Sequence, residues 1–192
     1  MNIDVKNKTL VFGIGQGGIN ALDKLLAKIK KDEFTEYFAM DSDIETLKNS
    51  TAEHKITIGY DITYGKSCYC DTKLGENCVV SSEEMLSNLI NGAVEVIILT
   101  CLGKGIGSGA TLQFLRMVKG ENLYTTVICT CPQDFEGKSS EVGTDFLGRI
   151  EPFIDDYILV GPENIENTTL QDMYTELEHK MVVACINKLF EI

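Results

Sequence analysis

The sequence has 192 residues, of which 44% are hydrophobic and 24% are charged, and its formal net charge is -12 at pH 7. This length and composition predict one globular domain over residues 1–192, with a core large enough to fold alone and no second domain. The net negative charge argues against a nucleic-acid binder, because affinity for the phosphate backbone rests on clustered Lys and Arg.

The N-terminal residues lack the basic head, the long apolar run and the cleavage site of a secretory signal, and no apolar stretch approaches ~20 residues. We therefore expect a cytoplasmic protein with no membrane insertion. Seven cysteines without an even framework indicate reduced thiols. The pairs Cys68/Cys70 and Cys129/Cys131 have C-x-C spacing and no histidine nearby in sequence, so no metal site is predicted.

Short β-branched runs alternate with helical patterns along the chain. Strands are predicted at Thr9–Gly13, Tyr37–Met40, Lys55–Ile58, Val94–Thr100, Thr125–Cys131 and Tyr157–Val160. Helices are predicted at Ile19–Lys30, Ser82–Asn91, Ala110–Val118 and Val142–Ile150, and one long helix from Thr169 to Phe190. The segment from Gly59 to Asn77 lacks periodicity and is predicted to be a long loop with little helix. The alternation predicts an α/β fold, a three-layer parallel sheet with helices on both faces.

A first glycine-rich segment joins the first predicted strand to the first predicted helix. It contains Gly13, Gly15, Gln16, Gly17, Gly18 and Asn20, and it satisfies G-x-G-x-x-G. Glycine lets backbone N–H groups approach phosphate oxygens closely, and a helix N-terminus adds favourable partial charge. Asp41 lies 23 residues after Gly18, where a Rossmann fold holds a ribose. An NAD(P)-binding oxidoreductase is therefore one interpretation of this segment.

A second glycine-rich segment follows the fourth predicted strand and precedes a predicted helix. It consists of Gly103, Lys104, Gly105, Ile106, Gly107, Ser108 and Gly109. Alternate glycines allow a concave nest of N–H groups, to which Ser108 can add a hydroxyl and Lys104 a charge. An ordinary Rossmann domain needs only one such loop, and neither segment reads as a P-loop. The sequence therefore predicts a second phosphate cradle.

The two segments together resemble the GTPase domain of the FtsZ/tubulin superfamily, whose G-G-G-T-G-(S/T)-G motif is similar to Gly103–Gly109, with Lys104 and Ile106 as departures. The resemblance covers nearly the whole chain, in order. Residues 40–47 are similar to the family's N-T-D-x-x-x-L segment, and residues 58–65 resemble L-G-x-x-x-T-x-G. It implies a Rossmann-like nucleotide-binding domain that ends in the family's central helix.

The resemblance also assigns roles to residues further along the chain. Glu136 falls where the family binds ribose hydroxyls, and Asn20 where it reaches toward guanine or ribose. Tyr174 and Glu178 fall where the family stacks an aromatic ring on guanine and accepts from its N1 and N2 hydrogens; four residues apart, they share one helix face. A carboxylate can accept both guanine N–H groups, while adenine offers no matching donors.

Several positions depart from the family pattern. Ser67-Cys68-Tyr69 replaces Gly-Ala-Gly in the loop that senses the terminal phosphate, and its side chains restrict the backbone there. The arginine four positions after the glutamate is missing, and the contact of the family's asparagine to the base passes to Asn164 if it is kept. The chain ends at Ile192, within or just past the central helix, so the family's catalytic loop is expected to be absent and no catalytic residue is predicted.

We expect a protein that binds GTP or GDP, with Mg²⁺ accompanying GTP, and that has weak or no self-sufficient hydrolysis. The resemblance implies a role in filament assembly or its regulation, through self-association or a longer FtsZ/tubulin-like partner. Two alternatives stay open. One is the oxidoreductase built on the first glycine segment and Asp41, and the other is a degenerate scaffold that makes protein contacts and binds no nucleotide.

Overall fold

A computed structural model describes residues 3–133, 136–162 and 169–190. Its centre is a six-stranded sheet of order β3-β2-β1-β4-β5-β6, in which every neighbouring pair is parallel. The strands are β1 (Thr9–Ile14), β2 (Thr35–Asp41), β3 (His54–Thr57), β4 (Glu95–Cys101), β5 (Tyr124–Thr130) and β6 (Asp156–Val160). The predicted parallel α/β fold is confirmed.

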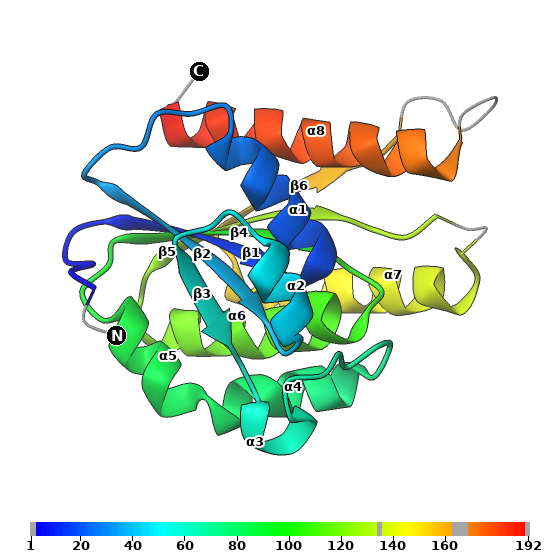
Figure 1. Cartoon of the computed structure of the whole chain (residues 1–192), viewed down its shortest axis with the longest axis horizontal. Coiled ribbons are helices and arrows are strands. Elements are labelled where there is room, and N and C mark those ends of the chain that lie inside the picture. Colours follow the sequence, from blue (N-terminus) through cyan, green and yellow to red (C-terminus); the bar gives the residue numbers. More distant parts are fainter. Residues whose placement is uncertain (1–2, 134–135, 163–168, 191–192) are drawn as a thin grey trace.

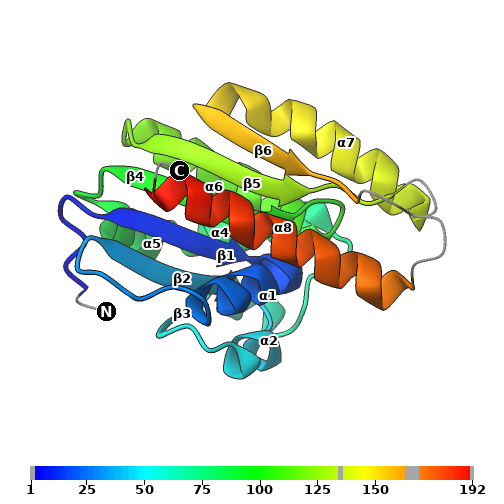
Figure 2. The ribbon, with the colours of Figure 1, turned by 90° about the horizontal axis from the view of Figure 1, so that it is seen from above.

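Helices cover both faces of the sheet (Figures 1 and 2). One face carries α1 (Gly15–Leu26), α2 (Ile44–Asn49) and the long α8 (Leu170–Phe190). The other carries α4 (Thr72–Ser81), α5 (Glu83–Ile90), α6 (Thr111–Gly120) and α7 (Lys138–Ile150). Short turns complete the chain: α3 (Tyr60–Thr63), the π-helical η1 (Gly105–Ala110) and the 3₁₀ turn η3 (Glu151–Phe153).

Each face of the sheet has its own apolar core. Phe12 from β1 stacks on Phe38 of β2, with ring centroids 4.9 Å apart, and meets Phe114 of α6 edge-on at 4.8 Å. On the other face Leu22 of α1 and Met181 of α8 are fully buried in one cluster. Alternate residues of a strand point to opposite faces, so strands that are apolar throughout require this double cover.

One sequence interpretation is wrong: the segment from Gly59 to Asn77 is not a loop with little helix. It contains the single turn α3 and the first part of α4. Asp71 caps α4 by accepting a hydrogen bond from the Leu74 backbone N–H at 2.9 Å. The sequence hid this helix because Gly75 and polar residues interrupt its apolar spacing. Gly75 is required there, since a Cβ would lie 2.2 Å from the Gly105 carbonyl oxygen.

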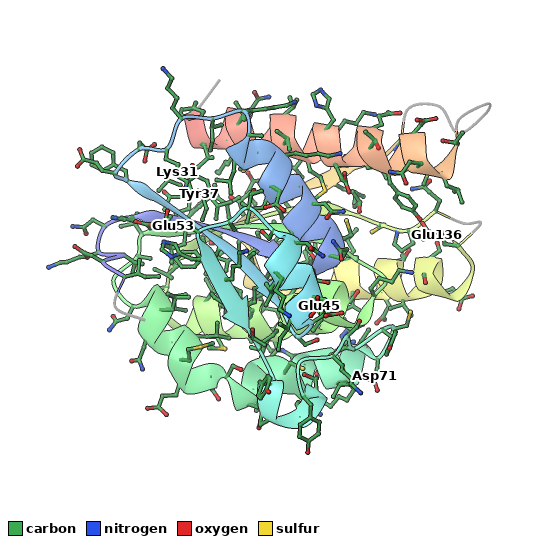
Figure 3. All side chains as sticks on the ribbon, in the orientation of Figure 1. Lys31, Tyr37, Glu45, Glu53, Asp71 and Glu136 are labelled. Carbon is green, nitrogen blue, oxygen red and sulfur yellow. The ribbon has the colours of Figure 1, made fainter. Side chains whose placement is uncertain are left out.

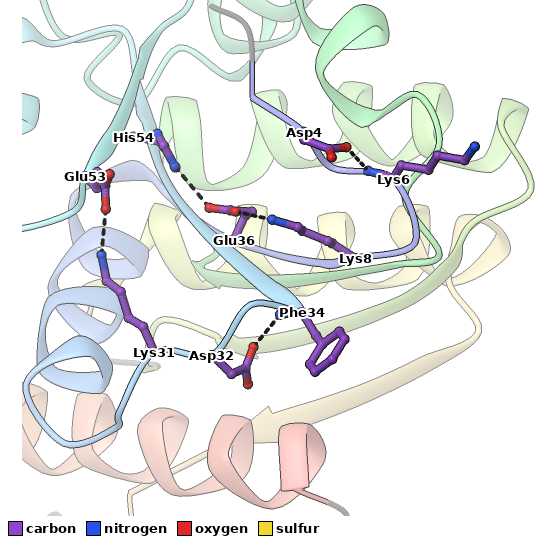
Figure 4. Close-up of polar contacts among 9 residues, drawn as sticks. All are labelled: Asp4, Lys6, Lys8, Lys31, Asp32, Phe34, Glu36, Glu53 and His54. Carbon is purple, nitrogen blue, oxygen red and sulfur yellow. Dashed lines mark hydrogen bonds and ion pairs between the residues drawn. The ribbon is translucent and has the colours of Figure 1, made fainter.

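Charged side chains at the amino ends of the strands pair locally (Figure 4). Lys8 and His54 both contact the Glu36 carboxylate, at 2.7 and 3.1 Å. Lys31 and Glu53 form an exposed pair at 3.0 Å. Figure 3 shows Lys31 and Glu53 on the opposite side of the molecule from Glu136. The amino end of the sheet is therefore occupied by ion pairs, and the opposite end carries the glycine-rich turns.

Candidate functional site: a cleft across two glycine turns

The site lies where the direction of strand order reverses. The chain proceeds from β1 outward to β2 and β3 on one side, and from β4 outward to β5 and β6 on the other. β1 and β4 are neighbours, with Ile14 opposite Thr100. Both strands end in glycine-rich turns at the same edge. Open α/β sheets bind their ligands in the crevice outside the carboxyl ends of the strands at such a switch point.

The first glycine turn is already the first turn of α1. Gly15 begins the helix with a φ of +73°, a conformation that favours glycine. A Cβ on Gly18 would lie 2.1 Å from the Leu99 carbonyl oxygen, and one on Gly17 would lie 2.4 Å from the Cys101 sulfur. These glycines therefore let α1 approach β4 closely, which brings the helix N-terminus to the switch point.

The second glycine turn runs from Gly103 through η1 into α6. A Cβ on Gly107 would lie 2.0 Å from the Cys101 carbonyl oxygen, and one on Gly109 would lie 1.9 Å from the Thr72 carbonyl oxygen. The Gly105 N–H donates to the Tyr69 carbonyl oxygen at 2.8 Å. One N–H group of the predicted nest is thus already hydrogen-bonded within the protein, and two of its glycines are needed for close packing. π-Helical turns are rare in proteins, and those that occur are frequently found at functional sites.

A first cavity of about 400 Å³ lies at the open side of both turns. Its floor is formed by Gly15, Gln16, Gly17, Ile106 and Gly107. Lys104 contributes a positive charge to its wall. The far end is formed by Asp41, Asp43, Thr46, Ser67, Tyr69 and Cys70. Backbone N–H groups at a helix N-terminus, together with a lysine, suit a phosphate chain.

A second cavity of about 340 Å³ continues from the first and shares Gln16, Gly17, Cys101 and Lys104 with it. Its other walls come from α1, α8 and the connection between β5 and α7, and include Asn20, Glu136, Tyr174, Leu177 and Glu178. Burial and the Glu136 carboxylate raise the pKa of Tyr174. An aromatic ring and a carboxylate on one helix face offer stacking and two acceptors to a flat base.

A directed chain of hydrogen bonds joins the two cavities along α1. The Thr46 hydroxyl donates to Gln16 Oε1 at 3.0 Å, and Gln16 Nε2 donates to Asn20 Oδ1 at 2.9 Å. Asn20 Nδ2 then donates to Glu178 Oε1 at 3.0 Å. Lys24 completes the arrangement by donating to Glu178 Oε2 at 2.5 Å. Gln16, Asn20 and Lys24 follow one another at four-residue intervals, which places their side chains on one face of α1.

The structure brings together most of the residues singled out in the sequence. Those that line the two cavities are Gly15, Gln16, Gly17, Asn20, Lys104, Ile106, Gly107, Glu136, Tyr174 and Glu178. Others lie behind the walls, namely Gly18, Gly103, Gly105, Ser108 and Gly109. The Ser108 hydroxyl is fully buried and accepts from the Gly103 N–H at 2.7 Å. Asn164 lies outside the described residues.

Other lining residues were given no role in the cleft by sequence reasoning. Asp41 was noted for a ribose in the dinucleotide interpretation, and both Asp41 and Asp43 as part of the motif at residues 40–47. Burial raises the pKa of the Asp41 carboxyl to about 6. Cys101 lines both cavities, and burial raises the pKa of its thiol to about 11, which keeps it protonated and poorly nucleophilic. The sequence could have indicated Cys101, because this residue lies at the end of a strand that leads into the second glycine-rich segment.

Among residues 3–133, 136–162 and 169–190, no group of three or more His, Cys, Asp or Glu side chains could hold a metal ion. Within the same ranges no helix is long and apolar enough to cross a bilayer.

The fold and the cleft define a Rossmann-like α/β domain with paired glycine turns at its switch point. The family model described as the Tubulin/FtsZ family, GTPase domain, matches residues 8–169 of the sequence. The chain therefore belongs to the Tubulin/FtsZ family.

Individual relatives agree with this assignment. The chain is 27% identical over 161 residues to the cell division protein FtsZ of Buchnera aphidicola subsp. Baizongia pistaciae (strain Bp), over 82% of this chain and 41% of that relative. It is 24% identical over 196 residues to FtsZ of Neisseria gonorrhoeae, over 95% of this chain and 50% of the relative. The chain thus spans about half, or less, of the length of these relatives.

Solved structures show the same fold. An empty FtsZ dimer from M. jannaschii matches with a TM-score of 0.84 and 24% identity, over 92% of this chain and 52% of that one. CetZ2 from Haloferax volcanii, described as a GTPgS bound protofilament, matches with a TM-score of 0.78 and 19% identity, over 91% and 56%.

Proposed function

We propose that this chain binds a guanine nucleotide, GTP or GDP, in the cleft across the two glycine turns. The observation that carries the proposal is the continuity of the two cavities. Phosphates would lie over Gly15–Gly17, Gly107 and Lys104, and the base would lie against Tyr174 and Glu178. The family membership and the FtsZ relatives support the same ligand.

At the far end of the first cavity Tyr69 stands where the resembled family has glycine, and from this departure we infer weak turnover. The Tyr69 backbone has a φ of +48°, an uncommon conformation for a residue with a side chain, and the residue is 80% exposed where it lines the cavity. Mg²⁺ binds carboxylates together with substrate phosphates. Asp41 and Asp43 are the carboxylates that would hold it beside a triphosphate. We propose weak or no self-sufficient hydrolysis.

By its relatives' description as cell division proteins, the chain would act in filament assembly or its regulation in the cytoplasm. The partners would be a second copy of this chain or a longer FtsZ/tubulin-like protein. Sedimentation of the chain alone, and with a longer family member, in the presence of GTP would test this part of the proposal. Unchanged sedimentation of both chains in every mixture would contradict it.

Isothermal titration with GDP, GTP, ATP and NAD tests the ligand. We expect GDP or GTP to bind more tightly than ATP or NAD, because among these bases guanine alone presents a ring N1–H beside an amino N2–H to the two oxygens of Glu178. Tighter binding of NAD would favour the oxidoreductase interpretation, and absence of binding by all four would favour the scaffold. Mass spectrometry of ligand retained through purification provides an independent measurement.

Replacing Glu178 by Ala should cost ~1–3 kcal/mol of guanine-nucleotide affinity, the range for losing hydrogen bonds to a charged group. Glu176→Ala is the matched control, because it removes the same charge from the same helix. Glu176 pairs with Lys180 at 2.8 Å and does not line either cavity. Equal affinity of Glu178→Ala and the wild-type chain would refute the role of Glu178.

A further inference from the structure

The Glu178 carboxylate is held from two sides by α1. Asn20 Nδ2 donates to Oε1 at 3.0 Å, and Lys24 Nζ donates to Oε2 at 2.5 Å. The Glu178 side chain is 15% exposed and that of Lys24 is 39% exposed. A pair at this depth is less screened than a surface ion pair. Each carboxylate oxygen therefore has one fixed partner on the helix opposite.

The remaining acceptor capacity of Glu178 matches the edge of guanine. A carboxylate offers about four lone-pair positions, two on each oxygen. Asn20 uses one position on Oε1 and Lys24 one on Oε2, which leaves one on each oxygen. Guanine presents N1–H and N2–H side by side, so a paired contact requires one open position on each oxygen.

We propose that Lys24 is a positioning residue that orients the Glu178 carboxylate so that the site reads the 2-amino group of guanine. This inference rests on the proposed function, since it names what sets base selectivity in the same cleft. Without Lys24 the carboxylate keeps only the hydrogen bond from Asn20 on Oε1. It can then rotate about its last side-chain torsion, which is broad, and Oε2 loses its fixed direction.

The partner on the other oxygen is already fixed without Lys24. Gln16 Nε2 donates to Asn20 Oδ1, so the amide nitrogen of Asn20 faces Glu178. Gln16 is itself oriented by the Thr46 hydroxyl, which donates to its Oε1. Removal of Lys24 therefore affects mainly Oε2, and the loss should fall on one of the two guanine N–H groups.

Titration of GDP against inosine diphosphate tests the proposal that the contact is with the 2-amino group, because inosine diphosphate lacks that group and keeps N1–H and both phosphates. In the wild-type chain we expect a preference for GDP of about tenfold or more, the equivalent of one hydrogen bond to a charged acceptor. In Lys24→Met the preference should fall below about threefold, a residual of under half of that hydrogen bond. Lys24→Arg should restore it, because a guanidinium can donate to the same oxygen.

Lys28→Met is the matched control, since Lys28 lies four residues beyond Lys24, in the turn just after α1, and contacts His179 of α8 at 2.9 Å. It should keep the wild-type preference for GDP. Chemical denaturation checks folding, and Lys24→Gln serves as a second neutral variant if Lys24→Met is unstable.

An unchanged GDP preference in a folded neutral variant would overturn the role of Lys24. Equal wild-type affinity for GDP and inosine diphosphate would overturn it as well and leave guanine-nucleotide binding intact. Absence of binding by either nucleotide would instead refute the proposed function.

Discussion

Individual glycines at this site serve two purposes, because some line the cavity and others allow close packing within the protein. The alternate glycines after β4 predict a backbone free to approach a phosphate. In the structure Gly107 lines the first cavity and also lies against the Cys101 carbonyl oxygen. Gly109 does not line either cavity and lies against the Thr72 carbonyl oxygen. The sequence could not separate these purposes, because the contact of Gly109 is with α4, a helix that the sequence pattern conceals.

Gly109→Ala should destabilise the fold by about 1–3 kcal/mol, the usual cost of an overpacked core position. Its Cβ would lie 1.9 Å from a backbone oxygen, which cannot move without shifting α4. Gly148→Ala, in α7 with no atom within 4 Å of the added Cβ, should stabilise by about 0.5–1 kcal/mol. Urea denaturation measures both variants, and equal stabilities would contradict this account of Gly109.

At the scale of elements, the two glycine turns are tied together through β4. The Thr100 hydroxyl lies 3.3 Å from the Ile14 carbonyl oxygen, at the end of β1, and 3.0 Å from the Gly107 carbonyl oxygen in η1. It also accepts from the Thr111 hydroxyl at 3.3 Å. Thr100 is fully buried. One hydroxyl therefore fixes where the first turn, the second turn and the start of α6 meet.

Thr100→Val should lower the free energy of unfolding by about 1–3 kcal/mol, because it leaves buried polar groups unsatisfied. Nucleotide affinity should fall as well, since the turns lose their common anchor. Thr126→Val is the matched control, because the buried Thr126 hydroxyl has no partner among the described residues. It should be neutral or slightly stabilising. Denaturation and titration compare the two, and an equal loss in both would argue against a special role of Thr100.

The strands were the most predictable elements. All six were predicted within two residues at each end, because short runs of β-branched residues bounded by turn residues are typical of strands. The long α8 was predicted from its apolar spacing, and its residues Tyr174 and Glu178 reach the predicted cleft. The start of α1 was missed, since glycines at 15, 17 and 18 conceal a helical turn held by tertiary packing. The short α2 offered too few residues for any period.

At the scale of the whole molecule, the cleft joins the two halves of the sheet, which meet at β1 and β4. A ligand bound only by the folded chain at 100 times its Kd raises the free energy of unfolding by about 2.7 kcal/mol. For a chain of this size that corresponds to a rise in Tm of about 5–10 °C. We expect GDP to produce this rise and ATP, at the same concentration, to produce little. Calorimetric binding of GDP without any rise in Tm would contradict a site that requires the folded sheet.

The row of polar side chains on α1 has a consequence for the size of the ligand. Gln16 and Lys24 are eight residues apart, which corresponds to about 12 Å along a helix axis. Gln16 lies beside the two glycine turns, and Lys24 contacts the Glu178 carboxylate at the second cavity. The two side chains are thus held at a fixed separation along α1, and this separation limits the length of a ligand that can contact both. In the proposed binding mode a free base or a free diphosphate would contact only one end of this row, so we expect tight binding only of molecules that carry both groups about this far apart.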